Sequence, residues 1–221
     1  MCGICGIVED RPRPELERET EIMRERLRHR GPDDRGLASG EGWALGHRRL
    51  AVVDLSPAGH QPMPPRGAGP WLVYNGEVYN AGALRERLEG LGWVFRGRSD
   101  SEVVQAALET WGEAALPQLR GQFALAAWWP DRRELLLARD PMGIRPLLVQ
   151  RTALGLRFAS ELGALGSVAE LGGLALESLR EYLVFQYVPQ PHSIAADVMK
   201  LAPGHRLRYR AGFPPEVARF A

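Results

Sequence analysis

The chain has 221 residues, 45% of them hydrophobic, which is enough to form one sizeable core. Its 28 basic and 27 acidic residues nearly cancel, so neither a nucleic-acid-binding surface nor a patch for an anionic membrane is expected. No apolar run of about 18 residues predicts a transmembrane helix, no signal-peptide pattern opens the sequence, and a cytoplasmic location is expected.

The first seventy residues are predicted to hold two strands, one helix and a loop. A short strand at Ile4–Val8 is followed by a helix at Glu15–His29, and Trp43–Val53 is predicted to be a long strand. The apolar stripe of the helix consists of Leu16, Ile22, Met23 and Leu27. Pro57–Pro70 holds five prolines and three glycines and is therefore predicted to be a loop.

The next forty residues or so are predicted to form one strand and two helices. The strand at Trp71–Tyr74 is expected to end at Asn75-Gly76. The first helix is marked by leucines at helical spacing, namely Leu84, Leu88 and Leu91, with Gly92 closing it. The second helix runs from about Ser99 to Trp111.

Strands dominate the rest of the chain. They are predicted at Phe123–Trp129, Glu134–Arg139, Leu147–Gln150, Gly155–Ala159 and Arg206–Arg210, with one helix at Glu177–Tyr187. The first of these strands is apolar on both faces, as in a strand between two layers. Because helices are interspersed singly and regular βαβ alternation is missing, the sequence predicts an α+β domain with mainly antiparallel sheet.

Cys2 stands directly behind the initiator Met1, and a Met that precedes a small residue is usually removed. Its removal would leave a thiol and a free α-amine on one residue, which is the nucleophile and base of N-terminal-residue hydrolases. Cys thiols titrate near ~8.5 and α-amines near ~7.7–8.0, so such an amine can accept a proton close to neutral pH. The alternative is an accidental small residue at the start of a buried strand.

Cys2 and Cys5 also match the spacing C-x-x-C, which occurs in redox motifs and metal sites. No second Cys pair completes a zinc site, and a strand rather than a helix is predicted after the pair. Cys5 is therefore interpreted as a small buried apolar residue.

Three further motifs each permit a structural and a functional interpretation. Asn75-Gly76 between β-prone segments is a strong signal for a hairpin turn, but a side-chain amide and a Gly N–H can also form an oxyanion hole. Ser99 with Glu102 forms a capping box, whereas the Asp100 carboxylate between them could accept from a substrate ammonium.

The third motif is the pair Arg48-Arg49 in an otherwise apolar strand. Strand alternation places the two arginines on opposite faces, and the one that faces inward needs an anion such as a carboxylate. The alternative is an edge strand with both arginines in solvent. Together, the motifs suggest an α-amino acid held by Arg and Asp, with its side-chain amide offered to a thiol, which is glutaminase chemistry.

A longer series of motifs occurs in one order along residues 1–205. They are Met1–Ile7, Arg30–Asp34, His47–Asp54, Gly59–Met63, Tyr74–Asn80, Ser99–Glu102, Arg120–Ala124, Arg139–Leu147, Phe158–Glu161 and Tyr187–Pro189 through Leu201–His205. In this order they resemble the N-terminal glutaminase domain of the asparagine synthetase B family. That domain is a class II (N-terminal nucleophile) glutamine amidotransferase.

The resemblance implies a fold and a set of roles. The fold would be a four-layer α-β-β-α sandwich of two mainly antiparallel sheets. Cys2 would be the nucleophile with its α-amine as base, and Asn75 and Gly76 would form the oxyanion hole. The implied ligands of L-glutamine are Arg49 for the carboxylate, Asp100 with Gly76 and Glu77 for the ammonium, and the backbone of Leu50, Val52 and Val53 along the pocket.

The synthetase half of the family is not recognisable, because no Ser-Gly-Gly-x-Asp-Ser pyrophosphate loop occurs. Residues 1–205 are expected to form the amidotransferase domain, and residues 206–221 the start of a linker. No cofactor is expected in this domain, and ATP and Mg would belong to a synthetase domain or subunit that receives the ammonia. A homodimer, a catalytically idle docking domain and an ammonia donor for another amidation are left open.

Overall fold

The computed structural model describes all 221 residues. The strands are β1 (Gly3–Glu9), β2 (Asp34–Gly40), β3 (Trp43–Arg49), β4 (Trp71–Val78), β5 (Gly121–Trp129), β6 (Glu134–Arg139), β7 (Leu148–Arg151), β8 (Gly155–Ala159), β9 (Val198–Lys200), β10 (His205–Arg210) and β11 (Glu216–Arg219). The α-helices are α1 (Leu16–Arg26), α2 (Ala81–Glu89), α3 (Asp100–Trp111), α4 (Leu162–Leu165) and α5 (Leu176–Phe185). None of these helices has both the length and the apolar composition that a membrane-spanning helix requires.

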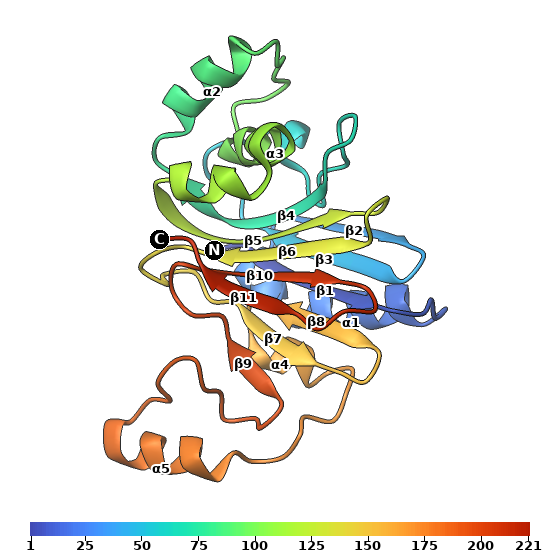
Figure 1. Ribbon diagram of the computed structural model, residues 1–221, viewed down its shortest axis with the longest axis vertical. Helices are drawn as coiled ribbons and strands as arrows, with labels where there is room; N and C mark the ends of the chain where they lie inside the picture. Colours follow the sequence, from blue (N-terminus) through green and yellow to red (C-terminus); the bar gives the residue numbers. More distant parts are fainter.

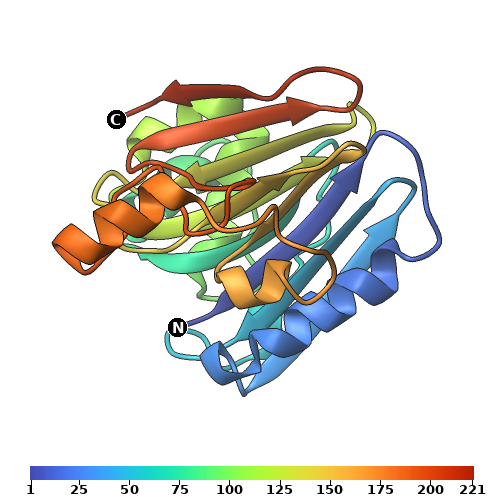
Figure 2. The same cartoon turned by 90° about the horizontal axis from the view of Figure 1, so that it is seen from below.

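The strands form two antiparallel sheets that pack face to face (Figure 1). One sheet has the order β2-β3-β1-β8-β7-β9 and the other the order β11-β10-β6-β5-β4. Helices α2 and α3 cover the outer face of the second sheet, and α1 and α4 cover the outer face of the first (Figures 1 and 2). This arrangement confirms the predicted four-layer α-β-β-α sandwich.

Three separate apolar cores fill the spaces between the four layers. Strand β5 shows how the sequence produces them, because both of its faces are buried. Phe123 and Leu125 pack under α2 and α3, whereas Ala124 and Ala126 pack between the sheets. Side chains of a strand alternate between its faces, so an unbroken apolar run is required at this position.

The predicted strand Trp43–Val53 is too long, and β3 ends at Arg49. Its neighbours explain the end: β1 begins at Gly3 opposite Arg48, and β2 begins at Asp34 opposite Arg49. Beyond this point no adjacent strand offers backbone hydrogen bonds, so the chain leaves the sheet as a loop. Two residues assigned to the apolar faces of predicted helices are exposed instead of buried: Ile22 is 37% exposed and Leu91 is 61% exposed.

The hairpin interpretation of Asn75-Gly76 is wrong as well. Strand β4 runs straight through both residues, which pair with Ala124 and Phe123 on β5. A Cβ on Gly76 would lie 2.4 Å from the carbonyl oxygen of Gln122, so glycine serves close strand approach here rather than a turn.

The tail beyond residue 205 is part of the second sheet. β10 pairs with β6, and β11 pairs with β10, so residues 206–219 do not form the start of a linker. The strand predicted at Arg206–Arg210 is confirmed within β10. The linker prediction rested on Arg and Pro content, but Leu207 and Tyr209 point into the inter-sheet core.

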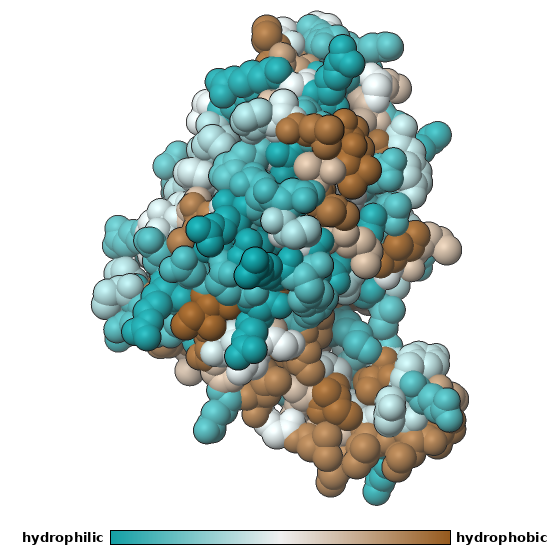
Figure 3. Space-filling view, turned by 180° about the vertical axis from the view of Figure 1, so that it is seen from behind, coloured by the Kyte–Doolittle hydropathy of each residue, from teal (hydrophilic) through white to brown (hydrophobic).

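Helix α5 stands apart from the sandwich, at the bottom of Figure 1. Of its residues only Ser178 is buried, while Leu183 and Val184 are each 72% exposed. The helix accounts for the apolar surface at the lower right of Figure 3.

Candidate active site

A cavity of about 220 Å³ opens at one end of the space between the two sheets. All nine residues predicted for the site line it: Cys2, Arg49, Leu50, Val52, Val53, Asn75, Gly76, Glu77 and Asp100. They come from the start of β1, the end of β3 and the loop after it, the middle of β4, and the start of α3. The N-terminus lies at this end of the sandwich (Figure 2).

Strand alternation explains why three of these side chains converge. Cys2, Arg49 and Asn75 lie an even number of positions from residues that pack between the sheets. Those residues are Ile4, Leu45 and Val73. The three polar side chains therefore point into the space between the two sheets, at the end of the apolar core that fills it.

The Cys2 thiol lies against the first residue of the loop that follows β3. Its Sγ is 3.4 Å from the N–H of Leu50, which donates to it, and the Cys2 carbonyl accepts from Arg30 Nε at 2.9 Å. Burial raises the pKa of the Cys2 thiol, while the Leu50 N–H, the N-terminal amine, Arg49 and Arg145 act to lower it. The surroundings thus hold the sulfur in place and stabilise its anion in part.

Cys5 lies in a different layer from Cys2. It is fully buried beneath α1, 3.8 Å from the carbonyl oxygen of Thr20, and burial raises the pKa of its thiol to about 12. Both cysteines are free thiols. The C-x-x-C spacing therefore forms neither a disulfide nor a shared site, and the interpretation of Cys5 as a buried apolar residue is confirmed.

The Asn75 side chain carries a donor without a partner. Asn75 is 1% exposed, and its Nδ2 forms no hydrogen bond although it lines the cavity. A buried unpaired amide costs about 1–3 kcal/mol, so the site favours a ligand that brings an acceptor to this atom.

The backbone N–H of Gly76 is a second free donor. Its partner across the ladder, Phe123, turns its own N–H and C=O toward Asp140, at 3.2 and 2.8 Å. Opposed residues of an antiparallel ladder point their backbone groups either toward or away from each other. Gly76 therefore directs its N–H away from β5, and β4 is the edge strand of its sheet.

The two neighbours that point the same way as Gly76 are already satisfied. The N–H of Tyr74 donates to Gln61 Oε1 at 2.6 Å, and the N–H of Val78 donates to Asp100 Oδ2 at 2.9 Å. The N–H of Gly76 lies between these two and is left for a ligand, next to the free amide of Asn75.

Asp100 is the first residue of α3 and also ties the helix to β4. Its Oδ2 accepts from the Tyr74 hydroxyl at 2.7 Å and from the Val78 N–H, whereas Oδ1 forms no hydrogen bond and is free for a cation. Only one of the two hydrogen bonds of the predicted capping box is present: Ser99 Oγ accepts from the Glu102 N–H at 3.4 Å. The Glu102 carboxylate binds the N–H of Gly97 at 2.8 Å instead of completing the box.

Arg48 and Arg49 lie on opposite faces of β3, as predicted, but the edge-strand alternative is wrong because β3 lies between β2 and β1. Arg48 forms a salt bridge with Glu25 on α1. Arg49 lines the cavity and donates to the backbone carbonyls of Asp54 and Ser56. It is thereby anchored to the loop that lines one wall of the cavity, where Val52 and Val53 are exposed.

Several residues of the site were not assigned a role from the sequence. Tyr74, Gln61 and Arg145 line the cavity, and Arg30 and Ser160 position the N-terminal strand, the latter by accepting from the Ile4 N–H at 3.0 Å. All five lie within the motifs of the family resemblance. The motifs therefore carried the signal, but no local pattern indicated what these side chains contact.

His47 on β3 is buried and joins the two sheets by its contact with Tyr74 on β4. Burial lowers its pKa to about 3, so the ring is neutral and its Nε2 can donate to the Tyr74 carbonyl oxygen, 3.2 Å away.

The sequence profile of a glutamine amidotransferase domain matches residues 1–216. A glutamine-hydrolysing asparagine synthetase of Bacillus subtilis is 36% identical over 95% of this chain and 34% of its own. A putative glutamine-hydrolysing asparagine synthetase of Mycobacterium tuberculosis is 40% identical over 88% of this chain and 32% of its own. The chain thus spans about a third of the length of these relatives.

The fold is shared with an amidotransferase of solved structure. Glutamine phosphoribosylpyrophosphate amidotransferase of B. subtilis superposes with a TM-score of 0.72 at 22% sequence identity, over 100% of this chain and 49% of the other. This similarity shows the N-terminal nucleophile amidotransferase fold.

Proposed function

This chain belongs to the glutamine amidotransferase domain family, whose members are enzymatic domains. From that premise we propose that it hydrolyses glutamine through Cys2. One observation carries the proposal: the thiol of the second residue shares a cavity with two donors that have no partner, Asn75 Nδ2 and the Gly76 N–H. A thiol beside two free donors is the arrangement that acyl transfer requires.

The reaction would proceed in two stages once Met1 has been removed. The free α-amine of Cys2 accepts the thiol proton, and Sγ attacks the γ-carbonyl carbon of glutamine. The developing oxyanion accepts from Asn75 and Gly76, the amine returns the proton to the leaving nitrogen, and ammonia departs. Water then attacks the γ-glutamyl thioester, which releases glutamate and restores the thiol.

The charges of the cavity would orient the substrate. Arg49 would bind its α-carboxylate, while Asp100, with Gly76 and Glu77, would bind its α-ammonium. Asp100 suits this role because one carboxylate oxygen is held by Tyr74 and Val78 while the other is free.

We further propose that the ammonia serves ATP-dependent amide synthesis of the asparagine synthetase type, in a synthetase domain or partner chain. The support is the length comparison, since the chain spans about a third of relatives that are named glutamine-hydrolysing asparagine synthetases. ATP and Mg would act there, and the amidotransferase domain would need no cofactor.

An assay of the purified chain tests the proposed function. With Met1 removed, as verified by intact mass, glutamine should give equal amounts of glutamate and ammonia. Absence of both products from a folded chain with a free N-terminal Cys2 would overturn the proposal.

Replacing Asn75 by Ala is expected to lower kcat by about 10²–10³, the usual effect of losing one oxyanion donor, with little change in KM. Asn75 donates only to the transition state in this account, and its Nδ2 has no structural partner to lose. Steady-state kinetics measures the change. A drop confined to KM would assign Asn75 to substrate binding instead.

Replacing Asp100 by Asn is expected to raise KM by about tenfold or more, because a charged hydrogen bond to the ammonium contributes about 1.5–3 kcal/mol. The amide oxygen can still accept from Val78, which leaves the NH₂ group facing the ammonium. An unchanged KM would restrict Asp100 to its role in the helix start.

A further inference from the structure

The turn between β6 and β7 brings a cation into the cavity. Arg145 lines the cavity together with Cys2, and its guanidinium forms neither a salt bridge nor a hydrogen bond within the chain. Its Nε is buried without a partner. The side chain as a whole is half-buried, and a buried polar nitrogen without a partner favours a ligand or an anion nearby.

Two buried charged residues hold the backbone of Arg145 in place. The Asp140 carboxylate accepts from its N–H at 3.0 Å, and Arg139 Nε donates to its carbonyl oxygen at 2.7 Å. Asp140 is 0% exposed and Arg139 is 5% exposed. The turn also needs Gly143, whose φ is 66°. These hydrogen bonds fix the backbone position of Arg145 and therefore the direction in which its side chain leaves the turn.

The other arginine of the cavity, Arg49, already forms hydrogen bonds within the chain. Arg49 donates to two carbonyl oxygens of the loop after β3, so part of its hydrogen-bonding capacity is used. Arg145, by contrast, has a guanidinium that pairs with no carboxylate and donates to no acceptor within the chain. We propose that Arg145 is a positioning residue that stabilises the thiolate of Cys2 electrostatically, which deepens and rests on the proposed glutamine hydrolysis.

The electrostatic surroundings of the thiol support this assignment. Burial raises the pKa of Cys2, and the guanidinium of Arg145 is among the charges that lower it. The other ionisable groups around the thiol are the N-terminal amine, Arg30, Arg49, Asp54, Tyr74, Glu77 and Asp100. The three carboxylates among them balance the three cations, so Arg145 adds the positive charge that favours the thiolate.

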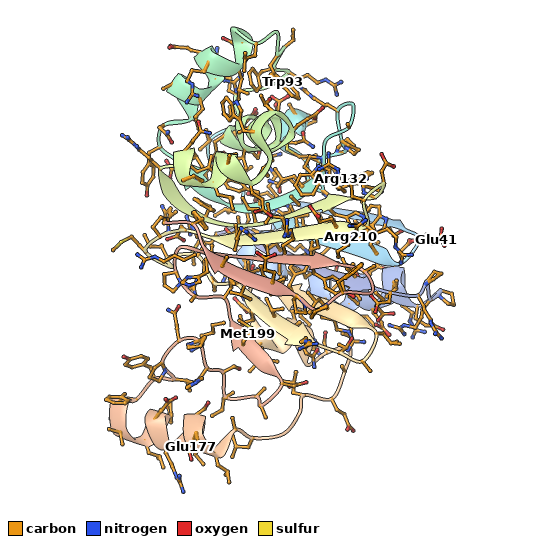
Figure 4. All side chains as sticks on the ribbon, viewed as in Figure 1. Glu41, Trp93, Arg132, Glu177, Met199 and Arg210 are labelled. Atoms are coloured by element: carbon orange, nitrogen blue, oxygen red, sulfur yellow. The ribbon has the colours of Figure 1, made fainter.

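Alkylation of Cys2 by iodoacetamide, measured against pH without glutamine, tests the proposal. The chains compared are wild type, Arg145→Gln, Arg145→Met, Arg145→Lys and the control Arg132→Gln, all with Met1 removed. Arg132 lies at the β5–β6 turn, at the other end of the sandwich from the N-terminus (Figures 1 and 4). Fragment-ion mass spectrometry of the N-terminal peptide, which holds both cysteines, reads Cys2 separately from the buried Cys5.

Both neutral variants should react about tenfold more slowly than wild type at neutral pH and reach the wild-type rate at alkaline pH. Arg145→Lys should restore most of the rate, and Arg132→Gln should match wild type. Identical profiles in all five chains would overturn the proposal. So would a raised KM for glutamine with an unchanged alkylation profile, because that result would make Arg145 a carboxylate ligand.

The alkylation profile needs no glutamine turnover. An absence of glutaminase activity would therefore count against the proposed function and leave the profile as the test of Arg145.

Discussion

Replacing Cys2 by Ala is expected to abolish glutamine hydrolysis, with a loss of at least about 10⁴-fold, while the fold stays intact. No other thiol can replace it, because Cys5 is buried in another layer beneath α1. The side chain of Cys2 contributes little to the core, since its contacts are with the loop residue Leu50 at the cavity wall. Ammonia release and circular dichroism of the variant measure the two halves of this prediction.

Cys5 provides the matched control for this substitution. Cys5→Ala removes one buried sulfur, which costs about 1 kcal/mol or more in stability, and it should retain the wild-type kcat. Turnover by Cys2→Ala above the background rate, or equal losses in both variants, would contradict the assignment of Cys2 as nucleophile.

Retention of residues before Cys2 is expected to have the second largest effect. The α-nitrogen of Cys2 is then part of a peptide bond and cannot accept the thiol proton, so the proposed general base is lost. A loss of about 10²–10⁴-fold follows from the usual contribution of such a base. Met1 itself lines the cavity and is 55% exposed, so a retained residue would also occupy part of the substrate site.

A cleavable N-terminal extension gives a clean measurement. The extended chain should be inactive, and proteolysis that leaves Cys2 as the first residue should restore activity in the same sample, with intact mass confirming each state. Full activity of a chain that keeps Met1 would show that another group serves as the base.

Sequence patterns predicted the elements that depend on interactions between residues close together in the sequence. The apolar faces of β5 and the Ser99 cap of α3 follow from residues within a few positions of one another. Strand β2 was missed because Asp34–Gly40 has almost no apolar alternation and exists through its pairing with β3. The hairpin predicted at Asn75-Gly76 failed for the same reason, since β4 is held straight by β5, a strand more than forty residues later.

The motifs predicted which residues lie together around the cavity but not the geometry of their contacts. Cys2, Arg49, Asn75 and Asp100 were named from motifs, and all four line one cavity. Which donors are free was beyond the sequence, because that depends on contacts such as the one between Tyr74 and Asp100. Arg145 lay within a recognised motif, yet only the fold shows that its charge is unpaired and turned toward the thiol's cavity.

Labelling with a glutamine-like diazo-ketone tests the central claim most directly. The chain without Met1 should take up one equivalent of the reagent, on Cys2 and not on Cys5, with glutaminase activity falling in proportion and excess glutamine slowing both. A labelled residue other than Cys2, or full activity in chains whose Cys2 is modified, would contradict the account.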